Sequence, residues 1–221
     1  MTRRAGANRD EPRAPVLDPA TLGEEPVSLA GDFEHERVRI AGEHTGLDGE
    51  GTLSECEVVG ADLTGTTLRP LTMRDVRWRR TELSNAVLRN VIAARVEIAE
   101  CRAVGLRLDL RQASDLLVRG CRLDYANVRL RDGKGRIRFE GCTFREATIC
   151  GELNDVVFTG CDLTAAEFDA ESARDCDLRG STLDCVRGLL TLRGAMIGAE
   201  QALEVAEALA IEAGLRVIHP A

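Results

Sequence analysis

An apolar residue recurs at every fifth position over most of this 221-residue chain. The series starts at Leu53 and keeps one register for sixteen units, as far as Val128. It slips by one residue within the segment RDGKG (131–135), slips back at Leu153, and continues to Leu183. An amphipathic helix repeats its apolar residues every three or four positions and a half-buried strand every two, so neither explains a step of five.

A step of five is typical of short, straight sides joined by corners. The residue at the repeated position, called i here, and the residue two places before it point to the same side, because alternate residues of a strand share a face. The other three positions of each unit face outward or turn the chain. Four such sides close into a square coil of about 20 residues, and the array predicts an all-β solenoid of about seven to eight stacked coils.

The cysteines test this interpretation independently. Cys101, Cys121, Cys142 and Cys161 all occupy position i−2, at spacings of 20, 21 and 19 residues. The two register slips fall where they must for these residues to form one column on one wall. A small side chain suits this slot because the larger residue at i fills the middle of a narrow coil. The remaining cysteines are Cys56 and Cys176, at i−2 on other walls, and Cys150 and Cys185, which do not follow the pattern.

The thiols are interpreted as small buried hydrophobes in a reducing compartment. Zinc needs ligands that converge on one point, usually through short CxxC spacings, and these are absent from the sequence. The three histidines, His35, His44 and His219, lie outside the regular array, so no nucleophile and base can be paired. We therefore expect no enzymatic activity, no metal site and no cofactor.

The two ends of the chain differ from the array. Residues 1–30 hold four of the six prolines without apolar periodicity and predict a disordered leader. Phe33 and Val38 extend the array weakly, which places the solenoid at 31–197. The segment 198–221 is expected to form a capping or dimerisation helix and tail, because a solenoid has an open apolar end that must be covered. The candidate helix residues are Leu203, Ala206, Leu209 and Ala210, with Gly214 as the C-cap.

The segments CDLTAAEF (161–168), CDLRGSTL (176–183) and GADLTGTTL (60–68) resemble the A(D/N)LXX signature of pentapeptide-repeat proteins. The tail LRGAMIGAEQALEVAEALA looks like the C-terminal end of actinobacterial members. The resemblance implies a right-handed quadrilateral parallel β-helix. It also implies a function, because the best-understood members mimic duplex DNA, bind DNA gyrase or topoisomerase IV, and often dimerise through C-terminal helices.

Charge is segregated along the chain. Residues 31–62 carry nine acids and two arginines, residues 63–148 carry ten acids and eighteen bases, and residues 149–185 carry nine acids and two bases. If the C-terminal helices pair two chains end to end, the two 149–185 segments meet and form one acidic surface. The candidate partner-binding acids are Asp155, Asp162, Glu167, Asp169, Asp175, Asp177 and Asp184.

The basic centre offers a different surface. Arg69, Arg89 and Arg129 share the i+1 slot of one wall, and Asp109 interrupts the row. Three hypotheses follow: a homodimeric DNA mimic that binds gyrase or topoisomerase IV, a scaffold with an unrelated protein partner, and a nucleic-acid binder that uses the arginines. The net charge of −8 weighs against the third hypothesis.

The sequence lacks a signal peptide and a run of 18 apolar residues, so we expect a cytoplasmic protein. One wall departs from the pattern, because Arg111 and Glu171 fall in its inward i−2 slot. Burying either charge without a partner would be costly. A local bulge that turns both side chains outward is expected there.

Overall fold

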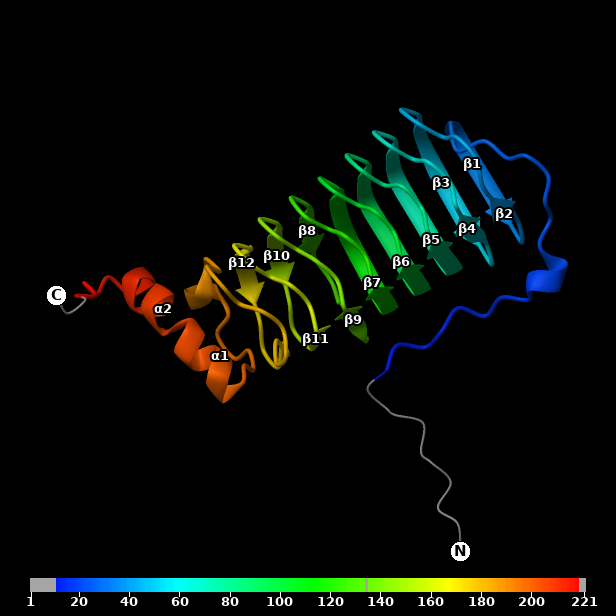
Figure 1. Cartoon of the computed structure of the whole chain (residues 1–221). Coiled ribbons are helices and arrows are strands. Elements are labelled where there is room, and N and C mark those ends of the chain that lie inside the picture. The colour runs from blue at the N-terminus through cyan, green and yellow to red at the C-terminus, as the bar shows by residue number, and fades with distance from the viewer. Residues whose placement is uncertain (1–10, 134, 219–221) are drawn as a thin grey trace, which may run out of the picture.

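The computed structural model describes residues 11–133 and 135–218. It shows a stack of parallel strands that forms a rod, with two short helices at the C-terminal end (Figure 1). The strands join in one sheet that winds around the rod in the order β1-β3-β5-β6-β7-β8-β10-β12, and the remaining strands pair beside this path. The predicted right-handed quadrilateral parallel β-helix, an all-β solenoid, is confirmed.

The strands follow the repeat closely. Their bounds are β1 Gly31–Glu36, β2 Arg39–Ile40, β3 Asp48–Ser54, β4 Glu57–Val59, β5 Thr67–Arg79, β6 Val87–Ala99, β7 Arg107–Arg119, β8 Asn127–Leu130, β9 Ile137–Glu140, β10 Thr148–Glu152, β11 Val156–Thr159 and β12 Glu167–Ser172.

Each coil has four walls, which we number from one complete coil. In residues 61–80, wall 1 is 61–65, wall 2 is 66–70, wall 3 is 71–75 and wall 4 is 76–80. The central residues of these walls are buried, as the five-residue step predicts: Leu63, Leu68, Met73 and Trp78.

The corners depend on backbone with positive φ. At the corner between wall 4 and wall 1, Arg80 and Glu100 adopt φ of 49° and 56°, and Gly60 and Gly160 of the same column adopt 61°. The left-handed region lets the chain turn sharply while every wall keeps its pairing with the coil above and below. Glycine is common at these corners because it enters this region without steric cost.

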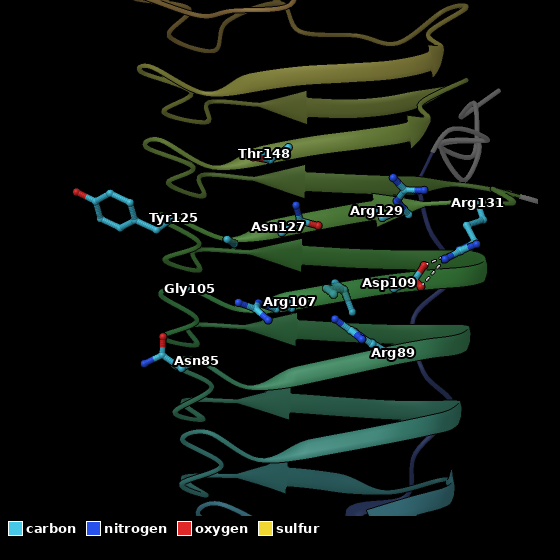
Figure 2. Close-up of a pocket in the computed structure, with 12 residues that line it drawn as sticks. Asn85, Arg89, Gly105, Arg107, Asp109, Tyr125, Asn127, Arg129, Arg131 and Thr148 are labelled. Carbon is cyan, nitrogen blue, oxygen red and sulfur yellow. Dashed lines mark hydrogen bonds and ion pairs between the residues drawn. The ribbon is translucent and has the colours of Figure 1, made fainter. Parts of the chain in front are cut away.

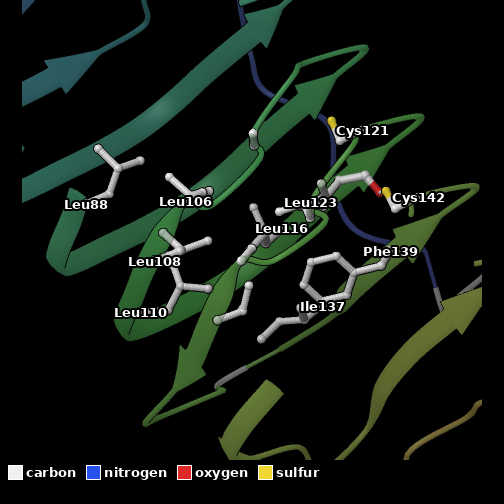
Figure 3. Close-up of a cluster of buried hydrophobic side chains, with 14 of the residues drawn as sticks. Leu88, Leu106, Leu108, Leu110, Leu116, Cys121, Leu123, Ile137, Phe139 and Cys142 are labelled. Carbon is white, nitrogen blue, oxygen red and sulfur yellow. The ribbon is translucent and has the colours of Figure 1, made fainter. Parts of the chain in front are cut away.

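The interior is a narrow column of aliphatic and aromatic side chains. Leu and Ile from several coils converge in its middle, as Figure 3 shows around Phe139. The ring of Phe139 stacks on Phe158 at a centroid distance of 5.0 Å and meets Phe144 edge-on at 5.4 Å. Cys121 and Cys142 lie on neighbouring coils at the edge of this core, in the column that their spacing predicts.

The column of small residues on wall 1 is tightly stacked. The backbone N–H of Cys101 lies 3.4 Å from the sulfur of Cys121, and the thiols of Cys142 and Cys161 point to backbone carbonyls. Their positions agree with the interpretation as small buried hydrophobes. Cys56, Cys150 and Cys176 are also buried, and Cys185 is exposed.

The two charged residues in the inward slot of wall 3 are turned outward. The pairing of β6 with β7 shifts between Val91 and Ile92, so that Leu110 takes the buried position and Arg111 is exposed. The pairing of β10 with β12 shifts between Gly151 and Glu152, and Glu171 is exposed there. The bulges expected at both places are therefore present.

Residues 11–30 have a defined path, where the sequence predicts a disordered leader; residues 1–10 lie outside the described part. The segment runs along the rod from its middle to its N-terminal end, where a short 3-10 helix, Pro19–Thr21, precedes β1 (Figure 1). Gly23 pairs with Val38 of the first coil, and Leu29 is fully buried.

Two helices close the C-terminal end of the solenoid, where the sequence predicts one. They are α1, Ala199–Glu204, and α2, Ala206–Glu212, and they are separated by Val205. None of the helices in the described ranges has the length and apolar character needed to cross a bilayer. Residues 219–221 of the expected tail lie outside the described residues.

Val205 projects into the core, while polar side chains of the same helices bind the edge of the last coil. Gln201 donates from Nε2 to the carbonyls of Leu178 and Ser181 at 2.8 and 2.6 Å. Glu212 accepts from the N–H groups of Gly188 and Leu190. The cap therefore supplies hydrogen bonds that a further coil would otherwise make.

Candidate partner-binding surfaces

The seven candidate acids all point outward, but they lie on different walls. Asp162 and Asp184 are on wall 1, and Glu167 and Asp169 are on wall 2. The other three, Asp155, Asp175 and Asp177, are at the corner after wall 3 or on wall 4. A single chain therefore does not present them as one continuous track.

Three of these acids are held by arginines. Asp162 accepts from Nε of Arg145 at 2.6 Å, Glu167 pairs with Arg187 at 3.1 Å, and Asp177 pairs with Arg179 at 2.7 Å. Hydrogen bonds from Arg179 hold the pKa of Asp177 below its usual range. For Asp162, burial raises the pKa, but hydrogen bonds from Thr164 and Arg145 outweigh it and lower the pKa.

Three acids come together in one groove near the C-terminal end. Asp155, Asp175 and Asp177 line a cavity of about 670 Å³, together with the bases Arg136, Arg138 and Arg179. Asp155 and Asp175 are exposed, and the structure shows no ion pair for either within the described residues. Of the seven candidate acids, these two carboxylates and those of Asp169 and Asp184 are the ones without an arginine partner among the described residues.

The arginine row on wall 2 has the expected alignment, and Asp109 lies opposite Arg129 on the neighbouring strand. Arg69 is 3.8 Å from Asp48, at the edge of the acidic N-terminal coils. Arg89 and Arg129 lie farther along the wall and line an open groove of about 790 Å³ (Figure 2).

The groove also contains residues that the sequence pattern did not single out. Arg107 and Asn127 occupy the i−1 slot of wall 2, and Arg131 follows at the corner. Asn85 and Tyr125 stand at the opposite edge of the wall (Figure 2). Counting arginines in both outward slots of the wall, i−1 as well as i+1, would have identified Arg107.

The candidate cap residues are mostly turned to solvent. Leu203 is 81% exposed and Leu209 is 40% exposed. Ala206 is exposed and Ala210 half-buried. The helix surface that contacts the solenoid is instead formed by Gln201, Val205 and Glu212.

Comparison with solved structures identifies the architecture. A trypsin-treated form of QnrB1, a plasmid-mediated fluoroquinolone resistance protein, matches with a TM-score of 0.56 and 24% identity, covering 86% of this chain and 98% of that one. The chain has the fold of the pentapeptide-repeat proteins. A second trypsin-treated QnrB1 structure matches with a TM-score of 0.43 and 21% identity, over 88% and 99% of the two chains.

HetL, a pentapeptide-repeat protein involved in heterocyst differentiation regulation in the cyanobacterium Nostoc, matches with a TM-score of 0.28 and 16% identity, over 78% of this chain and 89% of its own. No protein-family model and no curated protein matches the chain. The actinobacterial type implied by the tail stays a prediction.

The pentapeptide-repeat walls place few groups together for chemistry. Within residues 11–133 and 135–218, no three His, Cys, Asp or Glu side chains converge as a metal site would require. Burial raises the pKa of the Cys176 thiol to about 12. The structure presents three distinct surfaces for a partner: the outward acids, the arginine groove and the exposed side of the cap.

Proposed function

We propose that this protein is a non-enzymatic, cytoplasmic binding protein that forms a homodimer through its C-terminal helices. Its partner is a bacterial type II topoisomerase, DNA gyrase or topoisomerase IV, which it engages by imitating duplex DNA. Binding modulates the enzyme and protects it from quinolones.

The observation that carries this proposal is the apolar surface on the exposed side of the cap. Leu203 is 81% exposed, Ile211 57%, Leu215 64% and Ile218 77%. Large exposed apolar side chains that recur within one terminal segment favour an interaction site there. Because they stand at the free end of the rod, a second copy joined there would continue the solenoid end to end.

Two further features support the choice of partner. QnrB1, whose fold this chain shares, is a fluoroquinolone resistance protein. The acidic segment 149–185 forms the coils next to the cap, so in an end-to-end dimer both copies place their free acids near the joint. Negative charge on a rod-shaped surface is the property that a DNA-binding groove recognises.

The first experiment measures the oligomeric state by light scattering. The proposal predicts a dimer, and the double variant Leu203→Glu, Leu215→Glu should be a folded monomer, because charge is disfavoured in an apolar interface. The control, Val16→Glu, changes an exposed apolar residue beside Asp75, several coils away from the cap, and should remain a dimer. A monomeric wild-type protein would contradict the homodimer.

The second experiment is a gyrase supercoiling assay with and without a quinolone. We expect protection or inhibition that weakens in Asp169→Asn, Asp184→Asn, whereas Asp32→Asn, Glu50→Asn at the far end should behave as wild type. No effect at micromolar protein would remove the topoisomerase proposal. An effect that survives neutralisation of the C-terminal acids would remove the DNA-mimic part.

A second candidate function is a scaffold with an unrelated protein partner. It is favoured by the spread of the acids over several walls and by the arginine pairing of Asp162, Glu167 and Asp177. A dimer that is inert in the supercoiling assay would favour this candidate.

A further inference from the structure

The groove on wall 2 concentrates positive charge that the protein neutralises only in part. Four arginines line it, and Asp109 is the one acid among its lining residues in the described chain. Arg131 donates two hydrogen bonds of 2.8 Å to the carboxylate of Asp109, one from Nε and one from a terminal nitrogen. For Arg89, Arg107 and Arg129 the structure gives no ion pair within residues 11–133 and 135–218.

This arrangement differs from the rest of the rod. On wall 4 of the same coils, Glu97 accepts from both Arg77 and Arg119, at 2.9 and 2.6 Å. On wall 2 itself, Arg69 lies beside Asp48 and Arg187 pairs with Glu167. These arginines have acid partners, whereas Arg89, Arg107 and Arg129 stand together in a concave surface without an ion pair.

The size of the basic surface limits what could occupy it. Arg89, Arg107 and Arg129 belong to three successive coils, so the outer two strands are about 10 Å apart at the spacing of a β-sheet. Acidic residues bound this basic surface at both ends along wall 2: Asp48 lies on one side and Asp169 on the other. A polynucleotide laid along the wall would meet these acids, whereas a compact anion would not.

We propose that this groove binds a compact anion with two or three adjacent phosphate groups. Guanidinium forks match phosphate oxygens in a bidentate geometry, and three without acid partners suit an anion with several charges. The amides of Asn85 and Asn127 add hydrogen-bond donors at the edge. Binding of an anion relieves the repulsion among the arginines. The site therefore selects ligands by their density of negative charge more than by their shape.

The anion has two possible sources, an inorganic polyphosphate and a nucleotide. Tyr125 provides a way to distinguish the two sources. The residue is 59% exposed at the rim of the groove, and its hydroxyl donates to Glu146 at 3.1 Å. An exposed aromatic face can stack on a nucleobase. A nucleoside triphosphate that uses this ring binds more tightly than inorganic tripolyphosphate.

The test is calorimetric titration of the full chain with sodium tripolyphosphate in low-salt, phosphate-free buffer. We expect one site per chain and at least a tenfold loss of affinity in the double variant Arg89→Gln, Arg129→Gln. The matched control is the double variant Arg69→Gln, Arg187→Gln, which also removes two charges from wall 2 but at places where an acid is nearby, and it should bind as wild type. Circular dichroism of each variant verifies that it is folded.

Three results would overturn the proposal: no binding at millimolar tripolyphosphate, unchanged affinity in Arg89→Gln, Arg129→Gln, or an equal loss in the control variant. The source is decided by titration with ATP. ATP that binds more tightly than tripolyphosphate, with the gain lost in Tyr125→Ala, identifies a nucleotide; equal affinities identify an inorganic anion. Binding of a single-stranded oligonucleotide while tripolyphosphate gives no heat would replace the compact anion with nucleic acid and refute the proposal.

Discussion

The carboxylate of Asp115 holds Arg13, a residue 102 positions earlier in the chain, by accepting from its backbone N–H at 3.0 Å and from its Nε at 2.8 Å. Two coils away, Asp75 accepts from the N–H of Val16 at 3.0 Å. Both carboxylates belong to the corner after wall 3 and are almost completely buried. These hydrogen bonds hold residues 11–18 against several coils, and we call this segment the strap.

Loosening the strap should lower stability without changing the solenoid. Asp115→Asn removes one acceptor oxygen and the charge that Arg13 pairs with, so we expect a loss of about 1 kcal/mol in the free energy of unfolding. Hydrogen exchange of residues 11–18 should become faster. Asp155→Asn serves as the control, because Asp155 stands in the same corner column beyond the strap. Unchanged exchange in Asp115→Asn would show that the ion pair does not fasten the segment.

Two glycines with positive φ should respond very differently to alanine. At Gly151, with φ of 94°, a Cβ would lie 2.0 Å from the carbonyl oxygen of Leu130 on the neighbouring coil. At Gly160, with φ of 61°, nothing lies within 4 Å. We expect Gly160→Ala to cost about 1 kcal/mol, since Arg80 and Glu100 tolerate the same corner conformation.

Gly151→Ala should cost about 3 kcal/mol or more, because backbone atoms of two coils would have to separate. Urea denaturation of both variants measures the difference. Equal losses would mean that the coils move apart easily at β10, which would weaken the description of the stack as close-packed.

The attachment of the C-terminal helices to the last coil should depend on the side-chain amide of Gln201. In Gln201→Ala, the carbonyl of Ser181 loses the one donor that the structure gives it among the described residues. A buried acceptor left in this way costs about 2 kcal/mol. Glu204→Ala, on the exposed side of α1, is the matched control and should change little. The expected readout is faster hydrogen exchange over the last coil in the Gln201 variant alone.

The carboxylate of Asp177 should contribute to stability at neutral pH and lose that contribution in acid. Arg179 lowers its pKa in the folded protein below the value of about 3.9 in the unfolded chain. A depressed folded pKa means that the stabilisation is complete above the unfolded pKa and disappears as the pH falls through the folded one. In Arg179→Gln, a carboxyl NMR titration should show the pKa of Asp177 moving up.

The same variant should lose less stability than wild type as the pH is lowered, so their denaturation midpoints converge in acid. Arg193→Gln removes an exposed arginine for which the described structure shows no ion pair, and it controls for the lost charge. A titration curve of Asp177 that is identical in wild type and Arg179→Gln would contradict the assigned cause.

The sequence predicts the coil well because its pattern reports directly on the interior. A residue such as Leu163 or Phe168 must be apolar wherever it points inward, so the spacing alone defines the walls. The bulges at Arg111 and Glu171 were predictable for the same reason, since an unpaired charge cannot remain in the inward slot.

The strap and the cap follow different physical demands. Arg13 and Val16 bind through a few hydrogen bonds that no repeat encodes, so residues 11–18 show no signal in the sequence. At the cap, helical periodicity picked out Leu203 and Leu209 because they are apolar. The side chains that contact the coil are instead partly polar, since Gln201 and Glu212 must complete the hydrogen bonds of its open edge.

The positions of the surface charges follow from the sequence, but their pairing does not. The repeat predicts which wall and slot carries Arg89 or Asp177, because the register fixes both. It does not predict which charges are neutralised, since a long side chain such as Arg179 or Arg131 can reach acids in several slots. The separation of free from paired charges therefore became visible only in three dimensions.

The stacking of the coils gives side chains on one wall a regular spacing along the rod. Successive coils advance by about 4.8 Å, the spacing of neighbouring strands, whereas successive base pairs of duplex DNA advance by about 3.4 Å. Acids repeated once per coil therefore drift out of step with phosphates within a few repeats. A DNA-binding groove that accepted this rod would respond to its width and its average charge, and it would have no fixed register along the axis.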